Sequence, residues 1–483
     1  MKICFATSEA HPFAKTGGLG DVSSALAREL HRNGHDLRLF LPLYSGVLRA
    51  AHDLVPVDFL RDIPVPVGGR RVTFTAFTAL LPGSTLWIYL IHCPAFYDRP
   101  TIYTSDPDEH LRFSFLCRAA IESCQRMGWG PDVFHCHDWH TALIPIYLKS
   151  VYSWDSLFRA TRSVLTLHNL GYQGVFPAQV LPDLGLAEHA HHLHQGDLRA
   201  GRIGFLKNGI LQADSLTTVS PTYAREIQTS AYGFGLHEEI AARRGSLVGI
   251  LNGVDYEEWS PEADPWIPHR YSRDSLADKE KNKRALLQAA SLPHSPSRAC
   301  LGVVSRLTHQ KGLDLVIETL PALVERLDLS LVALGTGEAA MEESFRRLER
   351  AFPERVRFYR GHNDALAHQI EAGADFFLMP SRYEPCGLNQ MYSLRYGTVP
   401  VVRKTGGLAD TVKLFDPGTG EGTGFVFEHF VPNALRWALE LGVSVFRDPE
   451  AWRRIRRNAM AQDFSWSRQV RRYESLYQSL AQP

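Results

Sequence analysis

The sequence is poor in lysine and has no surplus of charge of either sign. Only ten of its 52 basic residues are lysine, and 52 acidic residues balance them, so the formal net charge is zero. A nucleic-acid or anionic-membrane partner favours a basic surplus, so neither is expected. The scarcity of lysine also makes each lysine inside a glycine-rich motif more informative, since lysine is a compact point charge and arginine a wide planar fork.

Paired cysteines and long apolar runs are also missing. The seven cysteines are odd in number and contain no Cys-x-x-Cys pair, which is typical of a reduced protein rather than of a disulfide framework or a zinc site. The chain starts directly on an apolar strand pattern, with no signal peptide, transit peptide or membrane-spanning run. We therefore expect a cytoplasmic protein, most simply in a bacterium, with no membrane partner.

With 483 residues, the chain is too long for one hydrophobic core, and two domains are expected. Short apolar runs alternate with helical patterns in both halves, and the runs at 300–304 and 376–379 are continuously apolar, as in parallel strands covered on both faces. This predicts an α/β fold of two doubly wound, Rossmann-like domains. Ligands of such folds bind at the carboxyl ends of the strands, so two such domains facing each other would form a deep cleft. The expected strands are 2–7, 37–41, 72–78, 86–92, 132–136, 163–168, 215–219, 248–251, 300–305, 329–334, 356–359, 375–379 and 399–402.

The domain boundary is expected between about 254 and 298. This region contains five prolines and no clear strand pattern. At the end of the chain, apolar residues from Val470 to Leu480 fall on one face of a predicted helix, which must pack on one of the two domains.

A glycine-rich segment, KTGGLGD, follows the first expected strand at 15–21 and precedes a helical pattern at 22–30. Glycines allow a close backbone approach to a ligand, and a helix N-terminus favours an anion, to which Lys15 adds a full charge. The segment is neither a dinucleotide fingerprint nor a Walker loop. The alternative is a plain strand–helix turn capped by Asp21. The same five residues recur in KTGGLAD at 404–410, where a structural turn is the stronger interpretation, although Gly406 and Gly407 could lie near a phosphate.

Two further motifs follow expected strands of the second half. Arg306 and Lys311 lie five residues apart just after the strand 300–305, where a pair of cations can hold a phosphate group. Glu384 opens the segment EPCGLNQ after the strand 375–379, where its carboxylate can accept hydrogen bonds from sugar hydroxyls. The alternatives are solvated surface cations and an acid that is favourable at a helix N-terminus.

Histidines gather at the ends of two strands in the first half. The segment HCHDWH at 135–140 suggests a metal, but it has no matching ligand cluster nearby in the sequence, so a polar strand end for carbohydrate is favoured. His168 ends another strand and can either orient a substrate or be a buried, hydrogen-bonded core residue. A different motif, GTGEAA at 335–340, fits the dinucleotide pattern G-x-G-x-x-A, with Glu354 as the acid some way along the chain, and alone would indicate a dehydrogenase.

Taken together, these motifs resemble the bacterial glycogen synthase and plant starch synthase family. The matching segments occur in the family's order and cover nearly the whole chain: 15–21, 138–140, 168–169, 251–255, 305–312, 335–338, 384–390 and 404–410. The resemblance implies a glycosyltransferase-B fold and an enzyme that transfers glucose, with retention of configuration, from ADP-glucose to the non-reducing end of an α-1,4-glucan such as glycogen or a maltooligosaccharide. It implies an acceptor-side domain over 1–256, a nucleotide-sugar domain over 257–460, and a helix within 461–483 that crosses back to the first domain. It implies no oligomeric state.

The resemblance also assigns roles to single residues. Lys15 matches the family's donor-binding lysine, Arg306 and Lys311 the pair that clamps the donor diphosphate, and Glu384 the acid needed for catalysis; His168 completes the expected catalytic set. The remaining expected substrate-binding residues are Gly18, Tyr97, Asp138, Asn252, Cys386, Gly387, Leu388 and Gly407. The chain departs from the family at Asn389, where threonine is usual, and at 101–104 (TIYT), in a loop on the acceptor side.

The chemistry expected from this set needs no metal and no cofactor. Negative charge builds on the phosphate oxygens as the glycosidic bond breaks, and Arg306, Lys311 and the backbone amides near Gly18 can stabilise it. Three rivals remain from the residues alone: an NAD-dependent oxidoreductase, a glucan phosphorylase with pyridoxal phosphate, and a glycan-binding module without catalysis, against which the two cations count.

Overall fold

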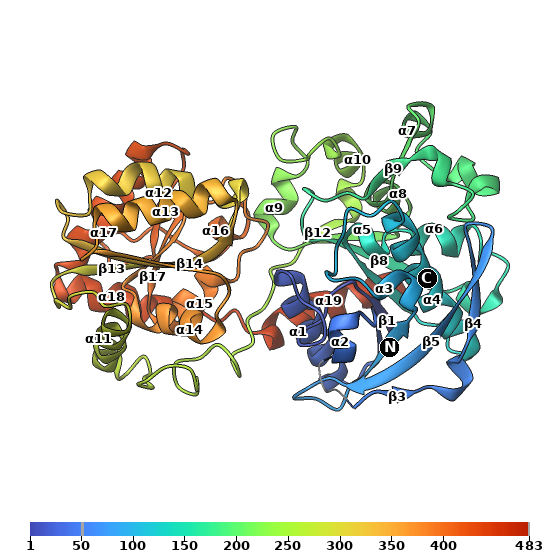
Figure 1. Ribbon diagram of the computed structural model, residues 1–483, viewed down its shortest axis with the longest axis horizontal. Helices are drawn as coiled ribbons and strands as arrows, with labels where there is room; N and C mark the ends of the chain where they lie inside the picture. The colour runs from blue at the N-terminus through green and yellow to red at the C-terminus, as the bar shows by residue number, and fades with distance from the viewer. Residues whose placement is uncertain (50–52, 482–483) are drawn as a thin grey trace. The chain divides into compact units, whose positions relative to one another are not determined.

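The computed structural model describes residues 1–49 and 53–481, which form two units (Figure 1). The first unit comprises Met1–Val219, Ala224–Gly253 and Trp466–Pro483, and the second comprises Ser220–Tyr223 and Val254–Ser465. The chain therefore passes between the units at 253/254 and 465/466, where the sequence predicted 256/257 and 460/461. Residues 482–483 of the expected C-terminal segment lie outside the described residues.

The first unit is built on a 10-stranded sheet with the order β12-β11-β8-β7-β1-β2-β6-β5-β3, and β4 pairs with β5. The strands from β12 to β6 are parallel, while β5 runs antiparallel to β6, β3 and β4. The strands of this unit, including the separate β9–β10 pair, are β1 Lys2–Ala6, β2 Asp36–Pro42, β3 Val55–Pro56, β4 Ile63–Val67, β5 Arg70–Leu80, β6 Trp87–His92, β7 Val133–His137, β8 Arg162–Leu167, β9 Val175–Pro177, β10 Arg202–Gly204, β11 Ser215–Thr218 and β12 Leu247–Gly249.

Every strand expected from the sequence in this unit is present, with ends shifted by one or two residues. The sequence did not predict β3, β4, β9 and β10. In β4 the prolines Pro64 and Pro66 obscure the pattern, because proline cannot donate to a ladder and argues against an interior strand. The structure accommodates both prolines because β4 pairs only with β5, at an edge, and its alternating burial still places Ile63, Val65 and Val67 in the core.

Helices of the first unit follow most of its strands. They are α1 Gly18–Arg32, α2 Ser45–Arg49, α3 Pro94–Tyr97, α4 Glu109–Arg126, α5 Asp138–Thr141, α6 Ile144–Lys149, α7 Gln195–Arg199, α8 Phe205–Gln212, α10 His237–Ala242 and α19 Trp466–Ala481; α9, Pro221–Glu226, begins in the second unit. No helix in the described chain is long and apolar enough to cross a membrane.

The second unit has a six-stranded, fully parallel sheet with the order β15-β14-β13-β16-β17-β18. This is the strand order 3-2-1-4-5-6 of the doubly wound nucleotide-binding fold, whose ligands bind where the order reverses, here between β13 and β16. Its elements are β13 Ala299–Leu307, β14 Leu329–Gly337, β15 Val356–Arg360, β16 Phe376–Met379, β17 Val399–Arg403, β18 Phe425–Phe427, α11 Lys279–Ala289, α12 Leu313–Thr319, α13 Ala339–Ala351, α14 Asp364–Gly373, α15 Asn389–Tyr396, α16 Gly406–Thr411, α17 Pro432–Phe446 and α18 Pro449–Met460.

Two hydrophobic cores cover the two faces of this sheet. Leu301 and Val303 of β13 pack in one core with α12, α13 and α17, while the preceding residue, Cys300, faces the other way and packs in the second core with α11 and α14. Figure 1 shows α12 and α13 on one face and α11 and α14 on the other. The continuously apolar strands recognised in the sequence are therefore buried on both sides.

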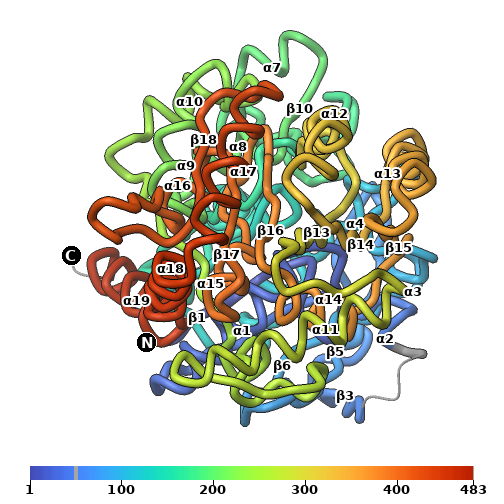
Figure 2. The backbone as a smooth tube through the Cα atoms, turned by 90° about the vertical axis from the view of Figure 1, so that its left-hand side faces the viewer, coloured from blue at the N-terminus to red at the C-terminus, as the bar shows by residue number. Residues whose placement is uncertain are grey.

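The C-terminal helix α19 belongs to the first unit. Its apolar stripe buries Val470, Tyr473 and Tyr477, and the Tyr477 hydroxyl forms a 2.7 Å hydrogen bond with Nδ1 of His135 on β7. Glu474 accepts a hydrogen bond of 2.9 Å from Asn33, just after α1, and Figure 2 shows α19 beside the N-terminal segment. The apolar stripe seen in the sequence thus packs on the first unit.

Candidate active site

The first KTGGL segment runs from the link after β1 into the first turn of α1, and its residues Lys15, Thr16 and Gly18 are exposed to solvent. Helix α1 begins at Gly18, four residues earlier than the sequence predicted, so that Gly18 lies in its first turn. Gly17, just before the helix, has extended backbone angles, and a Cβ added to it would meet no atom within 4 Å. Lys15 is exposed and forms a 2.8 Å ion pair with Asp21, one turn into the helix. The N-terminal N–H groups of α1 and the ammonium of Lys15 together form the anion-favouring arrangement expected from the sequence.

A buried glutamate that the sequence reading missed holds this segment. Glu9, only 3% exposed, accepts hydrogen bonds at Oε2 from the N–H of Thr16 at 2.7 Å and of Gly17 at 3.2 Å. Its Oε1 accepts from the hydroxyl of Thr16 at 2.7 Å and from that of Tyr103 at 2.6 Å. The only signal for Glu9 in the sequence is its place just past the end of an apolar strand, a position too common to single out one acid.

Asp138 and His168 come from neighbouring parallel strands, β7 and β8, and meet at their carboxyl ends. Oδ1 of Asp138 accepts a 2.7 Å hydrogen bond from the N–H of His168. Asp138 has a positive φ of 53°, which is rare for a residue with a side chain and is a form of strain that accumulates at functional sites. Burial raises the pKa of Asp138 to about 7, against the two N–H bonds that lower it, and burial lowers the pKa of His168 to about 3. His168 is therefore a neutral ring at physiological pH.

The other histidines of the HCHDWH segment are used inside the unit. His135, fully buried, bonds Thr166 at 2.7 Å in addition to Tyr477, and burial lowers its pKa to about 3. His137 shares a 2.9 Å hydrogen bond with His168. In residues 1–49 and 53–481, no group of three or more His, Cys, Asp or Glu side chains is arranged to hold a metal ion.

Two predicted substrate-binding residues of the first unit are both buried and differ in whether their polar atoms are hydrogen-bonded. Tyr97 is fully buried and its hydroxyl donates to the carbonyl of Arg112 at 2.9 Å, so the structure gives it a core role and does not bring it to a surface. Asn252 is 5% exposed, and its buried Oδ1 has no hydrogen-bond partner within the described chain. A buried polar atom without a partner is costly, and a ligand hydroxyl would relieve that cost.

In the second unit, the predicted cations and the predicted acid come from two neighbouring strand ends, those of β13 and β16. Arg306 lies near the end of β13, is exposed, and forms no side-chain hydrogen bond or ion pair within the described residues. Lys311 is half-buried after the same strand, and its ammonium lies 2.7 Å from Oε2 of Glu384, which is 4% exposed. The hydroxyl of Ser381 donates to the same oxygen at 2.9 Å. Lys311 and Glu384, predicted separately, are thus direct neighbours.

The second KTGGL segment supports the turn that carries Glu384. A Cβ added to Gly406 would lie 1.9 Å from the carbonyl oxygen of Glu384, and one added to Gly407 would lie 2.0 Å from that of Cys386. The N–H of Gly407 donates to the backbone carbonyl of Glu384 at 3.0 Å. The glycines are needed here for close packing of two backbones, so Gly407 contacts the Glu384–Cys386 turn directly. Lys404 is exposed and pairs with Glu428 at 2.6 Å.

The rest of the predicted segment 384–390 forms a tight turn into α15. Gly387 has a φ of 72°, the left-handed region that favours glycine, and Cys386 is 4% exposed. Leu388 is the residue before the helix and is half-buried. Asn389, where the chain departs from the family's threonine, donates to the carbonyl of Val304 on β13 at 2.8 Å, and so fastens this turn to the strand that carries Arg306.

The dinucleotide-like segment 335–340 has a different use. Gly335 and Gly337 lie inside β14, and a Cβ on them would come within 2.2 Å of the Ser305 carbonyl and 2.3 Å of the Leu307 carbonyl. The N–H of Gly337 already donates to the carboxylate of Glu342 at 3.2 Å. The glycines allow β13 and β14 to approach, so the pattern does not form the phosphate-binding turn that would favour an NAD-dependent enzyme.

Two family models match the chain. The model described as starch synthase catalytic domain covers residues 2–242, and the model described as glycosyl transferases group 1 covers 287–462. The chain is 43% identical to a glycogen synthase of Koribacter versatilis, over 100% of this chain and 99% of the relative, and 44% identical to a glycogen synthase of an Anaeromyxobacter species, over 100% of both.

A solved structure agrees over the same length. The catalytic domain of starch synthase IV from Arabidopsis thaliana, bound to ADP and acarbose, superimposes with a TM-score of 0.92 at 33% identity, covering 100% of this chain and 99% of that one. The two doubly wound units are those of a glycosyltransferase-B fold. On these likenesses and on the motifs placed above, the chain belongs to the glycogen synthase and starch synthase family of glycosyltransferases.

Proposed function

We propose that the protein transfers glucose from ADP-glucose to the non-reducing end of an α-1,4-glucan, such as glycogen or a maltooligosaccharide, with retention of the anomeric configuration. The observation that carries this proposal is the full-length likeness to a starch synthase whose structure holds ADP, the product that ADP-glucose releases on transfer. Relatives named glycogen synthase over the same length support the glucan as acceptor.

In the second unit, the groups available for the donor match its chemistry. Arg306 is an exposed cation at the strand end where ligands of this fold bind, and Lys311 is held 2.7 Å from Glu384. A diphosphate carries more negative charge than one carboxylate and competes with Glu384 for Lys311. Within the described residues, the Glu384 carboxylate contacts Lys311 and Ser381 through Oε2, which leaves Oε1 to accept hydrogen bonds from sugar hydroxyls.

In the first unit, the groups available for the sugar are neutral or nearly neutral. The ring of His168 has a pKa of about 3, so near neutral pH it offers hydrogen bonds without a charge. Asp138 orients His168 through its backbone N–H at 2.7 Å. Uncharged, preoriented groups suit an uncharged glucose ring, while Lys15 at the end of the unit's first loop suits the anionic part of the donor.

The leaving group is stabilised by charge in this mechanism. As the glycosidic bond breaks, Arg306 and Lys311 neutralise the phosphate oxygens, and the departing phosphate takes the proton of the attacking glucan hydroxyl on the same face, which gives retention. Preorganised cations of this kind are usually the largest catalytic contribution. We propose that these two side chains supply the charge without a metal ion or an organic cofactor.

The test is nucleotide release from ADP-glucose and from UDP-glucose, each with and without glycogen. We expect ADP release that depends on glycogen, together with new α-1,4 linkages, and much slower release of UDP. Release without glycogen, a preference for UDP-glucose, or no transfer at all would refute the proposal. The same assay in EDTA should keep full activity; a loss that Mg²⁺ restores would refute the metal-free mechanism.

A further inference from the structure

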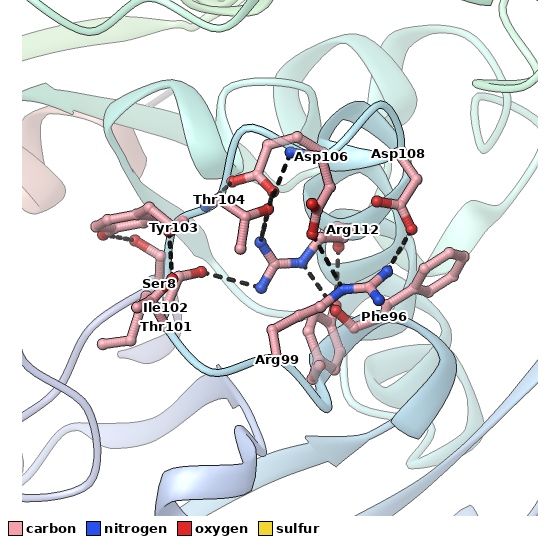
Figure 3. A network of polar contacts seen from close by, with 12 residues as sticks. Ser8, Phe96, Arg99, Thr101, Ile102, Tyr103, Thr104, Asp106, Asp108 and Arg112 are labelled. Atoms are coloured by element: carbon pink, nitrogen blue, oxygen red, sulfur yellow. Dashed lines mark hydrogen bonds and ion pairs between the residues drawn. The ribbon is translucent and has the colours of Figure 1, made fainter.

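The segment 98–108, between α3 and α4, is held rigidly by two arginines (Figure 3). Arg112 of α4 is fully buried; its Nε donates to the carbonyl of Phe96 at 2.8 Å, and its Nη2 donates to that of Ile102 at 2.9 Å. Arg99 forms a 2.6 Å ion pair with Asp108. A buried guanidinium needs such partners for its donors, so the segment and the arginine hold each other in place.

The middle of this segment carries Tyr103. Its neighbour Thr104 is fastened to Glu109, the first residue of α4, through a 2.8 Å hydrogen bond from its hydroxyl. The ring of Tyr103 stacks on His140 with ring centroids 4.7 Å apart. Figure 3 shows the hydroxyl of Tyr103 directed toward Ser8, from which it lies 2.8 Å away. The anchored backbone and the stacked ring therefore leave the hydroxyl little freedom of position.

That hydroxyl meets the carboxylate that holds the first KTGGL segment. Tyr103 donates to Oε1 of Glu9 at 2.6 Å, and the same carboxylate accepts the N–H groups of Thr16 and Gly17 and the hydroxyl of Thr16. Within the described residues, the Glu9 carboxylate accepts hydrogen bonds from these donors alone, and at 3% exposure it has little access to water. One carboxylate thus joins a rigid segment to a segment that is open to solvent.

We propose that Tyr103 and Glu9 are positioning residues for donor binding: through Glu9, the anchored segment 98–108 sets the conformation of residues 15–18 and with it the place of the Lys15 ammonium. The role of Lys15 in this inference rests on the proposed function; the mechanical link between Tyr103 and residues 15–18 does not.

The variant Tyr103→Phe tests the link because it removes one hydroxyl and keeps the ring on His140. Tyr152→Phe is its matched control: Tyr152 is also a buried tyrosine of the first unit, and its hydroxyl also donates to a glutamate, Glu122, at 2.9 Å. In the described chain, however, Glu122 forms no hydrogen bond or ion pair with residues 15–18; its partners are Tyr152 and Arg126. Both variants lose the same kind of bond, and only one loses a bond to Glu9.

Two measurements separate the link from the proposed function. In the ligand-free protein, hydrogen–deuterium exchange of a peptide containing Thr16 and Gly17 should become about tenfold faster in Tyr103→Phe, as expected for the loss of one hydrogen bond to a charged group, and should not change in Tyr152→Phe. In the transfer assay, Tyr103→Phe should raise the KM for ADP-glucose by about fivefold or more and leave the KM for glycogen and the kcat nearly unchanged.

Unchanged exchange in Tyr103→Phe, or equal acceleration in both variants, would overturn the positioning role. Faster exchange with an unchanged donor KM would overturn the connection to donor binding. If the wild-type protein fails to use ADP-glucose, the proposed function fails, and the exchange experiment still decides whether Tyr103 positions residues 15–18. The variant Glu9→Gln, which replaces one acceptor oxygen by a donor, should accelerate the same exchange more than Tyr103→Phe does.

Discussion

The segments 15–21 and 404–410 share five consecutive residues, and each joins a parallel strand to a helix. In the first, residues 7–17 separate β1 from α1, and in the second only 404–405 separate β17 from α16. In the longer connection, 7–17, a Cβ on Gly17 would meet no atom within 4 Å, and the side chain of Glu9 holds the segment through a hydrogen bond from the N–H of Thr16. In the shorter connection, Gly406 and Gly407 pack directly against the backbone of the turn that carries Glu384.

The difference shows that one sequence motif serves two physical purposes. At 404–410 glycine is required because a Cβ would overlap another backbone, and the rest of the segment is tied down, with Asp410 bonded to Thr222. At 15–21 no such overlap exists at Gly17, and Lys15 and Asp21 pair only with each other at the surface. The first copy is open to solvent, as a segment that meets a ligand must be, and the second supports the turn that carries Glu384.

The largest expected difference is in the free energy of unfolding of variants at Gly406 and Gly17, which hold the same position in the two KTGGL segments. Gly406→Ala should destabilise the fold by about 3 kcal/mol or more, because Gly406 has a φ of 44° and its new Cβ would lie 1.9 Å from the Glu384 carbonyl oxygen. Gly17→Ala, with no atom near the new Cβ, should cost less than about 1 kcal/mol. Urea unfolding of both variants measures the two costs, and equal costs would contradict the comparison.

The variant Lys311→Ala tests the lysine that pairs with Glu384, on the turn that the second KTGGL segment supports. Turnover should fall by roughly two orders of magnitude while the circular dichroism spectrum and the melting temperature stay near wild type, since the loss is that of one preorganised charge. Arg326→Ala is a suitable control, because Arg326 is an exposed cation of the same unit that pairs with Glu440. Near-normal turnover in Lys311→Ala would remove the diphosphate clamp from the mechanism.

Replacing Lys15 and replacing Lys404 should have different effects on the KM for ADP-glucose and similar effects on stability. Lys15→Ala should raise the KM for ADP-glucose roughly tenfold to a hundredfold, as expected for a lost charge-assisted contact. Lys404→Ala should change it less than twofold, and should change stability by no more than about 0.5 kcal/mol, because its pair with Glu428 is exposed. Steady-state kinetics with varied ADP-glucose measures both, and similar KM values for the two variants would show that the copies are functionally equivalent.

The smallest expected effect concerns the two aspartates. Asp410→Ala should destabilise the protein by about 1–3 kcal/mol, because the N–H and hydroxyl of Thr222 lose their partner. Asp21→Ala removes one solvent-exposed ion pair and should change stability by less than about 0.5 kcal/mol. Thermal unfolding of the pair measures the difference, and a larger loss in Asp21→Ala would reverse the assignment of the copies.

Much of the fold could be predicted from the sequence because its signals are local. Continuous apolar runs such as 376–379 are strands in both the prediction and the structure, and the apolar stripe of 470–480 indicated a docked helix. Edge strands such as β4, with two prolines, could not be predicted, since only the position at the edge makes those prolines acceptable. The unit boundaries at 253/254 and 465/466 likewise depend on contacts rather than on composition.

For the candidate site, the strand ends indicated where Asp138, His168, Arg306, Lys311 and Glu384 belong, but the pairing of these residues could not be read from spacing. The Lys311–Glu384 contact joins residues 73 positions apart, and the Tyr103–Glu9 contact joins residues 94 apart. Tyr97, which the resemblance assigned to substrate binding, is buried, and its hydroxyl is already bonded to the carbonyl of Arg112. Asn252 carries a buried oxygen without a partner among the described residues, a property that only coordinates reveal.

The sequence by itself determined the class of fold, the strands and the repeated KTGGL segment, because apolar periodicity and glycine placement act over a few neighbouring residues. Only the tertiary structure decided what each copy does. Whether a glycine is required depends on what a Cβ at its position would meet. At Gly406 a Cβ would meet the backbone of Glu384, whereas at Gly17 it would meet no atom within 4 Å. The N–H of Gly17 donates to Glu9, which Tyr103 also contacts. Contacts between residues far apart in the chain, rather than the five shared residues, separate a segment that is open to solvent from one that supports a turn.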